Sequence, residues 1–179
     1  DRWDFDYKIS EMKKLKIVLM GMGRIGKIHF RNIQQYFPQA EVVAVADPVW
    51  KKENFNQQFG PVFFSADPAE AIGHKEVDAI LICTPTSSHA ELIEQGLAKG
   101  KHIFCEKPMD LSLERTAMLV KKSKESRQKV MLGFNRRFDP DFMKAQKAVA
   151  EGAIGNLQIV KITSRDPGLP PIDYIKHSG

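Results

Sequence analysis

The chain of 179 residues carries 27 lysines and arginines against 22 acidic residues, which gives a formal net charge of +5. Its hydrophobic fraction of 42% suits a packed core, and its length holds one full domain and part of another. No apolar stretch reaches the ~18 residues of a membrane-spanning helix, and residues 1–7 lack the apolar core of a secretory signal. Cys83 and Cys105 form neither a metal-binding nor a disulfide spacing, so we expect reduced thiols, no metal and a cytoplasmic protein.

The first predicted elements are a strand, a glycine-rich turn and a helix. An apolar run at 15–20 leads into three spaced glycines, and a helical pattern follows over 24–37. In this context Gly21 allows a tight turn, Gly23 lets the backbone approach a pyrophosphate, and Gly26 lets the helix approach the sheet. Free N–H groups and the dipole at the helix start favour a phosphate. The turn therefore predicts dinucleotide binding, with contacts from Gly21, Gly23, Arg24, Ile25 and Gly26.

A second apolar strand, residues 42–46, ends at Asp47. A carboxylate at this position accepts hydrogen bonds from the ribose hydroxyls of the adenosine half and repels a 2′-phosphate. Pro48 follows it, rather than an arginine that would clamp a phosphate, although Lys51 and Lys52 are close in sequence. The sequence therefore favours NAD, with NADP as the less favoured cofactor.

The alternation of apolar strands and helices continues along the chain. Further strands are expected at 62–64, 78–83, 101–105 and 130–133, and helices at 51–59, after an N-cap at Asp67, at 88–99 and after an N-cap at Ser112. Continuous apolar strands separated by helices predict a parallel sheet covered on both faces, a doubly wound α/β domain of the Rossmann type. Ligands of such sheets bind beyond the carboxyl ends of the strands, so Thr84, Glu106 and Asn135 should border one crevice.

The densest basic stretch, residues 121–129, raises nucleic-acid binding as a hypothesis. The stretch contains no aromatic residue for base stacking and lies where a predicted helix ends. Lysines at a helix C-terminus face solvent and complement the helix dipole. We therefore expect no nucleic-acid partner, whereas the opposing hypothesis predicts an affinity for DNA or RNA that falls steeply with salt.

The pattern changes in the last part of the chain. A helix is expected over 139–151, and the alternation of apolar and polar residues over 156–165 predicts the first strand of a second sheet. One strand cannot bury its own face, so we expect the start of an incomplete second α/β domain. The predicted divisions are an N-terminal extension at 1–12, a Rossmann domain at 13–134 and the start of a substrate and oligomerisation domain at 135–179.

Three segments that follow predicted strands contain candidate catalytic or binding residues. In segment 84–89, hydroxyls could line the nicotinamide ribose, or Ser87 or Ser88 could simply cap the next helix. His89 either contacts the cofactor or begins that helix. In segment 133–139, arginines could bind hydroxyls or a carboxylate, or could tie the two domains together.

The third segment is Glu106-Lys107-Pro108. A lysine at the crevice can hydrogen-bond a substrate oxygen and stabilise charge as an alcohol loses its proton. A solvated surface lysine is the alternative interpretation of Lys107. Pro108 restricts the backbone at this position, and the Lys107–Pro108 peptide bond can be cis or trans.

Taken together, these segments resemble the family of glucose–fructose oxidoreductases, inositol dehydrogenases and rhizopine catabolism proteins, and within it the myo-inositol 2-dehydrogenases. The resemblance covers about residues 13–179. It rests on Gly21-Met22-Gly23-Arg24-Ile25-Gly26, Ala46-Asp47, Thr84-Pro85-Thr86-Ser87-Ser88-His89, Glu106-Lys107-Pro108 and Gly133-Phe134-Asn135-Arg136-Arg137-Phe138-Asp139. It implies a Rossmann domain followed by an open α/β domain, and NAD-linked oxidation of a polyol or sugar hydroxyl to a ketone by a homo-oligomeric enzyme.

The resemblance also implies roles for individual residues. Lys107 matches the family lysine that contacts the reacting hydroxyl, and Arg137 falls in a motif near the substrate mouth. Cofactor contacts are implied for Thr84, Pro85, His89 and Glu106.

The family's expected general base is a histidine that follows an aspartate by four residues, after a Gly-Gly. This motif lies downstream of Gly179 in the family pattern, so the 179-residue chain is expected to be inactive alone. The alternative function is a non-catalytic NAD-binding module or interaction protein. Comparing the activity of the chain with that of an extended chain separates the two hypotheses.

Overall fold

The computed structural model describes residues 13–165, 168–169 and 172. The chain divides into two compact units, Asp1–Leu132 and Gly133–Gly179. The predicted extension at 1–12 lies outside the described residues. Whether this division also separates a cofactor domain from a substrate domain stays a prediction.

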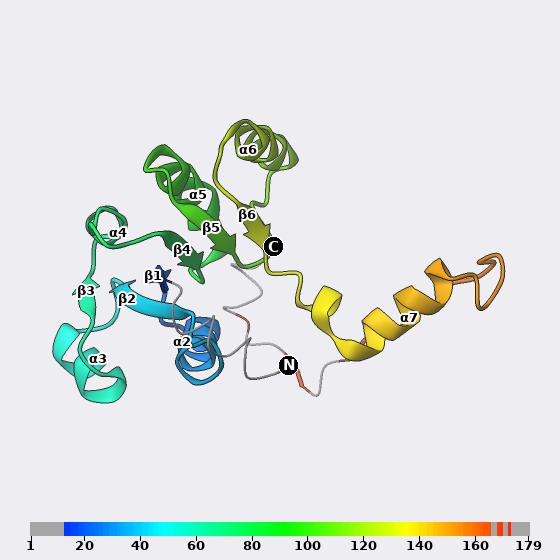
Figure 1. Cartoon of the computed structure of the whole chain (residues 1–179), viewed down its shortest axis with the longest axis horizontal. Helices are drawn as coiled ribbons and strands as arrows, with labels where there is room; N and C mark the ends of the chain where they lie inside the picture. Colours follow the sequence, from blue (N-terminus) through cyan, green and yellow to red (C-terminus); the bar gives the residue numbers. More distant parts are fainter. Residues whose placement is uncertain (1–12, 166–167, 170–171, 173–179) are drawn as a thin grey trace. The chain divides into compact units, whose positions relative to one another are not determined.

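Six strands of the described residues form one parallel sheet in the order β3-β2-β1-β4-β5-β6 (Figure 1). The strands are β1 (Leu15–Met20), β2 (Ala40–Ala46), β3 (Phe63–Ser65), β4 (Ala79–Ile82), β5 (His102–Cys105) and β6 (Val130–Leu132). The chain builds outward from β1 to β3, and then returns to the other side of β1 for β4, β5 and β6. This reversal of strand order between β1 and β4 is the ligand-binding point of a Rossmann-type sheet, so the predicted fold is confirmed.

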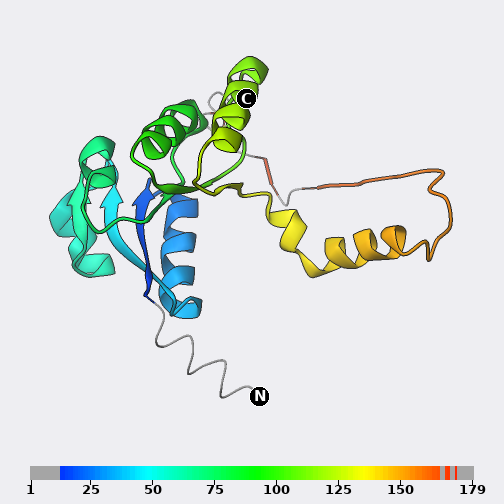
Figure 2. The ribbon, with the colours of Figure 1, turned by 45° about the horizontal axis from the view of Figure 1, so that its top comes forward.

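Helices cover both faces of the sheet, with α5 and α6 on one face and α2 and α3 on the other (Figure 1). Figure 2 shows α2 alongside β1. The helices of this unit are α2 (Arg24–Tyr36), α3 (Lys52–Phe59), α4 (Pro68–Ile72), α5 (His89–Ala98) and α6 (Leu113–Glu125). Asp67 and Ser112 cap α4 and α6 as predicted, each accepting a hydrogen bond from a backbone N–H of the first turn.

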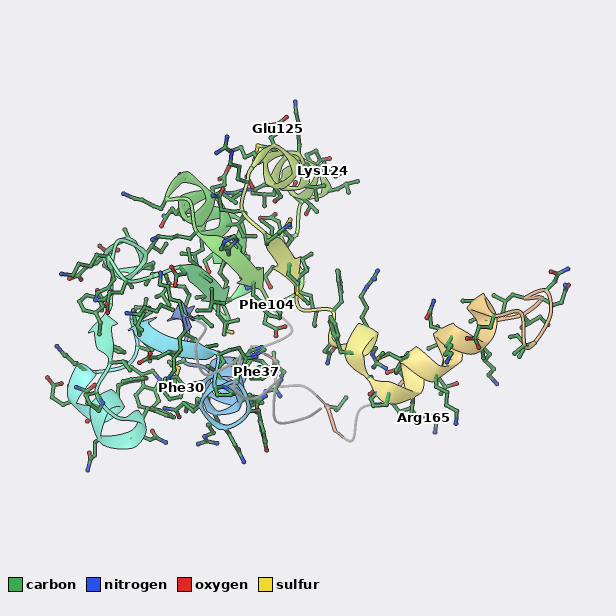
Figure 3. All side chains as sticks on the ribbon, in the orientation of Figure 1. Phe30, Phe37, Phe104, Lys124, Glu125 and Arg165 are labelled. Atoms are coloured by element: carbon green, nitrogen blue, oxygen red, sulfur yellow. The ribbon has the colours of Figure 1, made fainter. Side chains whose placement is uncertain are left out.

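Alternate residues of the strands pack into two separate hydrophobic clusters, which explains why the strands read as continuous apolar runs. In β1, Val18 and Met20 face one cluster, while Ile17 and Leu19 face the other. Helical residues complete the first cluster: Ala71, Ile72, Ala90, Leu92, Ile93 and Leu119. The second cluster contains Phe30 of α2 and Phe55 of α3, with Phe104 of β5 packed against it. Figure 3 labels Phe30 and Phe104.

The second unit contains η2 (Asn135–Phe138) and α7 (Pro140–Ala150), which Asp139 caps. The helix predicted over 139–151 is therefore confirmed. The strand predicted over 156–165 is wrong, because those residues adopt no regular structure. A strand is held by hydrogen bonds to a neighbouring strand, and the described part of this unit offers none. Ile159 and Ile162 are consequently 87% and 78% exposed.

Among the residues that the structure describes, no helix combines the length and the apolar character that crossing a bilayer requires.

Candidate dinucleotide-binding site

The turn between β1 and α2 depends on glycine at two positions. Gly21 has a φ of +88°, and a Cβ there would lie 2.9 Å from the carbonyl carbon and oxygen of Cys83. A Cβ on Gly26 would lie 1.9 Å from the carbonyl oxygen of Gly21. The first glycine is therefore needed for the turn and for a close approach to the end of β4, and the second for the contact between helix and turn. Both agree with the roles expected from the sequence.

Gly23 has a different environment, because a Cβ at this position would meet no described atom within 4 Å. The residue is extended and precedes α2, whose first turn contains no acidic residue and has no side-chain cap in the described structure. The first N–H groups of the helix and its dipole are therefore available to an anion. Open space above an uncapped helix start fits the pyrophosphate of a dinucleotide. Arg24 is exposed and Ile25 is half-buried beside this space.

Asp47 follows β2 and lies in the same region, and the residue is only 6% exposed. One carboxylate oxygen, Oδ2, accepts a hydrogen bond from the backbone N–H of Met22 at 2.6 Å. The other, Oδ1, accepts from the backbone N–H groups of Val49 at 2.8 Å and Trp50 at 3.2 Å. The predicted contact with a ribose stays a prediction. Asp47 also joins the glycine-rich turn to the loop after β2, a role that the sequence analysis missed.

Trp50 is a second feature that the sequence analysis missed at this end. Its Nε1–H donates to the carbonyl oxygen of Met22 at 3.3 Å, and Lys27 Nζ lies 4.9 Å from the centre of its ring. An open hollow of about 270 Å³ is lined by Val49, Trp50, Lys51 and Asn54. In the sequence, Trp50 is recognisable only as an aromatic residue soon after Asp47. Its contact with the glycine-rich turn depends on the folded structure.

The loop after β4 holds Thr84 and Pro85 and leads through η1 (Thr86–Ser88) into α5. The Ser88 hydroxyl donates to Thr84 Oγ1 at 2.7 Å and lies 2.9 Å from the carbonyl oxygen of Pro85. No side chain caps η1 or α5 within the described residues. Ser88 occupies the predicted N-cap position of α5, but the capping hydrogen bond expected of its hydroxyl is wrong, because the hydroxyl is turned back into the loop.

His89 is the first residue of α5 and is 1% exposed. Its Nδ1 lies 2.7 Å from the carbonyl oxygen of Pro108, and its Nε2 lies 2.9 Å from that of Thr84. The ring therefore bridges the loops that follow β4 and β5. Both ring nitrogens contact backbone carbonyls, and the cofactor contact that the resemblance implied for His89 stays a prediction. The alternative interpretation, that His89 begins the helix, is confirmed.

The segment Glu106-Lys107-Pro108 follows β5 directly. The Glu106 N–H donates to the carbonyl oxygen of Ile82 at 2.9 Å, so Glu106 lies beside the end of β4. The sheet therefore brings the loop of Thr84 and Glu106 to one edge, as predicted. Lys107 is exposed, and its peptide bond to Pro108 is cis.

Asn135 and Arg137 lie in η2 of the second unit, and both are exposed. Their predicted place in the crevice and the predicted substrate contact of Arg137 stay predictions.

The Glu106 carboxylate has a partner that the sequence analysis missed altogether. His29 of α2 places its Nε2 at 2.8 Å from Glu106 Oε1. The two residues are separated by 77 positions in the sequence, so no local pattern indicates the pair. The only local signal was a polar residue inside the helix that follows the glycine-rich turn.

The cysteines at the ends of β4 and β5 are free thiols. Burial raises the pKa of the Cys83 thiol far above its usual range, and the negative charge of Glu106 adds to the shift. Burial likewise raises the pKa of Cys105 to about 12, again with a contribution from Glu106. Both thiols are therefore protonated at neutral pH and are poor nucleophiles.

Residues 15–134 match a protein family described as an oxidoreductase family with an NAD-binding Rossmann fold. The chain therefore belongs to this family, as the resemblance predicted, and residues 15–134 carry its NAD-binding Rossmann fold.

Particular relatives narrow the comparison. The chain is 47% identical over 162 residues to inositol 2-dehydrogenase of Rhizobium meliloti (strain 1021), covering 90% of this chain and 48% of the relative. A crystal structure of a putative myo-inositol dehydrogenase from Sinorhizobium meliloti 1021 superimposes with a TM-score of 0.82 at 43% identity, covering 93% of this chain and 50% of that chain. Scyllo-inositol dehydrogenase from Lactobacillus casei, crystallised with NAD(H) and scyllo-inositol, gives a TM-score of 0.76 at 33% identity. The match covers 80% of this chain and 43% of that chain. The chain thus spans about half the length of the curated relatives that it matches.

Proposed function

We propose that this chain is the cofactor-binding part of an NAD-dependent oxidoreductase that oxidises a hydroxyl of an inositol, or of a related polyol or sugar, to a ketone. One observation carries the proposal. The glycine-rich turn and Asp47 lie at the carboxyl ends of β1 and β2, and the Thr84 and Glu106-Lys107 segments follow the adjacent β4 and β5 of the same sheet. The relatives named as inositol dehydrogenases supply the substrate class.

The cofactor would lie across the reversal of strand order between β1 and β4. Gly23 and the start of α2 would hold the pyrophosphate, and Asp47 would receive the adenosine ribose and disfavour NADP. The other half would lie over β4 and β5, near Thr84, Pro85 and Glu106. When bound, NAD supplies a hydride acceptor.

Lys107 would act on the substrate. Its ammonium group has three donors and a positive charge, so it can hold the oxygen of the reacting hydroxyl and stabilise the negative charge that develops as the proton leaves. Arg137 would bind further substrate hydroxyls. The general base would be the downstream histidine of the family pattern, and the complete enzyme would be a cytoplasmic homo-oligomer.

The test is the formation of NADH, followed by its absorbance, with myo-inositol, scyllo-inositol and glucose as substrates. The chain is assayed alone and as a chimera with the C-terminal half of the Rhizobium meliloti relative. We expect activity in the chimera only, and a loss of about a hundredfold or more in kcat for Lys107→Met, because general acid–base and electrostatic assistance typically contribute that much.

The matched control is Lys99→Met, which changes an exposed lysine between α5 and β5, at the end of β5 opposite to Lys107. A folded chimera that binds NAD but oxidises none of the substrates would contradict the enzyme proposal. That outcome would favour the alternative, a non-catalytic NAD-binding module.

A further inference from the structure

His29 and Glu106 form a contact between two elements that are far apart in sequence. The Nε2···Oε1 distance is 2.8 Å, and the side chains are 27% and 22% exposed. The His29 ring also meets the Phe104 ring edge-on, with 5.6 Å between the ring centres and an angle of 67° between the planes. The imidazole is therefore fixed on both sides, by a ring from β5 and by the carboxylate that follows β5.

This contact lies at the carboxyl end of the sheet, beside β5. Glu106 follows β5, which lies on the side of the β1–β4 reversal opposite to β2 and Asp47. Under the proposed function, this is the side of the nicotinamide. His29 contacts Oε1 of Glu106, and no hydrogen bond within the described residues uses Oε2, which can accept from another donor. A carboxylate here also favours the positive charge of the oxidised nicotinamide ring.

We propose that His29 is a positioning residue that orients Glu106 and sets the charge that this carboxylate presents to the nicotinamide half of NAD. The proposal rests on the proposed NAD binding. A neutral His29 donates Nε2–H to Glu106 and leaves the carboxylate charge uncompensated. A protonated His29 makes the same hydrogen bond but adds a positive charge, which offsets the carboxylate and weakens the attraction for oxidised nicotinamide.

One other histidine lies near this carboxylate, since His89 contacts the carbonyl oxygen of Pro108, and any effect of its charge on NAD binding would persist in His29→Gln. Glu106 is the acidic group that contacts His29 in the described structure. Cys83 and Cys105, at the ends of β4 and β5, stay protonated because their pKa values are raised. The remaining charges are basic side chains that ordinarily stay charged throughout this range: Arg24, Lys27 and Arg31 on α2 and Lys107 after Glu106.

The experiment is calorimetric titration of the 179-residue chain with NAD and with ADP-ribose, which lacks the nicotinamide, at about pH 6 and about pH 8, on either side of the ordinary imidazole range. For the wild type we expect NAD affinity to be about threefold weaker at the lower pH, the size typical of a partly exposed charge pair. The affinity for ADP-ribose should change less, because it carries no charged ring.

Two variants separate the hydrogen bond that positions Glu106 from the charge of His29. His29→Gln places an uncharged amide N–H where Nε2 lies, so NAD binding should lose its dependence on pH. His29→Phe keeps an aromatic ring against Phe104 but removes the donor, so NAD binding should weaken about fivefold at both pH values, and ADP-ribose binding less. The matched control is His102→Asn, at the opposite end of β5, where the amide oxygen can still accept from the backbone N–H of Lys129, and it should keep the wild-type profile.

The proposal would be overturned if NAD binding by His29→Gln kept the pH dependence of the wild type. It would also be overturned if the affinities of the wild type for NAD and for ADP-ribose changed equally with pH. Thermal melting checks the fold of each variant, and His29→Gln alone decides if His29→Phe does not fold. A folded wild-type chain that binds neither ligand would instead refute the proposed function itself.

Discussion

The two halves of the sheet edge formed by the carboxyl ends of the strands are stabilised in different ways. At the β1–β2 end, backbone geometry dominates, since Gly21 and Gly26 are required by contacts of main-chain atoms and Asp47 binds main-chain N–H groups. At the β4–β5 end, side chains from separate elements hold the loops, with His89 bridging two carbonyls and His29 contacting Glu106. One end is therefore fixed by close approaches and hydrogen bonds of main-chain atoms, and the other by hydrogen bonds between side chains and distant loops.

The largest expected effect tests the backbone-dominated end. Gly26→Ala would place a Cβ 1.9 Å from the Gly21 carbonyl oxygen, a main-chain atom that cannot rotate away. Helix and turn must separate, so we expect the free energy of unfolding to fall by about 3 kcal/mol, at the upper end for overpacked sites. Urea denaturation measures this loss. A variant as stable as the wild type would mean that the turn is not rigid.

The next effect concerns the side-chain-dominated end. His89→Ala removes a buried ring and leaves the carbonyl oxygens of Thr84 and Pro108 without this partner. We expect a loss of about 2–3 kcal/mol in the free energy of unfolding. His89→Asn places an amide near Nδ1 and His89→Gln places one near Nε2, so each should recover part of the loss. Urea denaturation of all three variants is the measurement, and equal stability of Ala, Asn and Gln variants would contradict the bridging role.

The smallest effect lies at the opposite edge of the sheet, near the amino ends of β1 and β4. The backbone N–H of Lys16 donates to the Asp78 carboxylate at 3.0 Å and, with a smaller contribution from Lys13, lowers the pKa of Asp78 below its ordinary value of 3.8. A lowered pKa stabilises the fold above that ordinary value, and the contribution disappears as the pH falls through the folded-state pKa.

We therefore expect Asp78→Asn to be less stable than the wild type at neutral pH, and the difference to narrow in strong acid. Thermal melting across the acid range measures it, with Asp141→Asn in the second unit as a control. A difference that is independent of pH would contradict the electrostatic explanation.

The sequence could predict the features that depend on residues close together in the chain. The strands and the caps at Asp67 and Ser112 follow from periodicity and capping rules that act over a few residues, and the roles of Gly21 and Gly26 follow from the spacing of the glycine-rich turn. The Ser88 interpretation failed because a hydroxyl can hydrogen-bond either to the helix ahead or to the loop behind, and propensity does not choose.

Other features depend on partners that are distant in sequence. The strand predicted over 156–165 had the right alternation, but alternation indicates a strand only where a neighbouring strand is available. His29 was missed for a related reason, because its contact with Glu106 is created by the fold. The family resemblance identified Glu106 and Lys107 but gave no indication of what holds them.

The central claim, that this chain binds NAD at the glycine-rich turn, is tested most directly by calorimetric titration with NAD and NADP. The matched variant is Gly23→Ala, since its methyl group enters open space in the described structure and lies where the pyrophosphate would approach. We predict that the wild type binds NAD more tightly than NADP, and that Gly23→Ala weakens NAD binding about tenfold, or roughly 1.4 kcal/mol, with little change in its melting temperature. A folded wild-type chain that binds neither cofactor, or a Gly23→Ala variant with wild-type affinity, would contradict the claim.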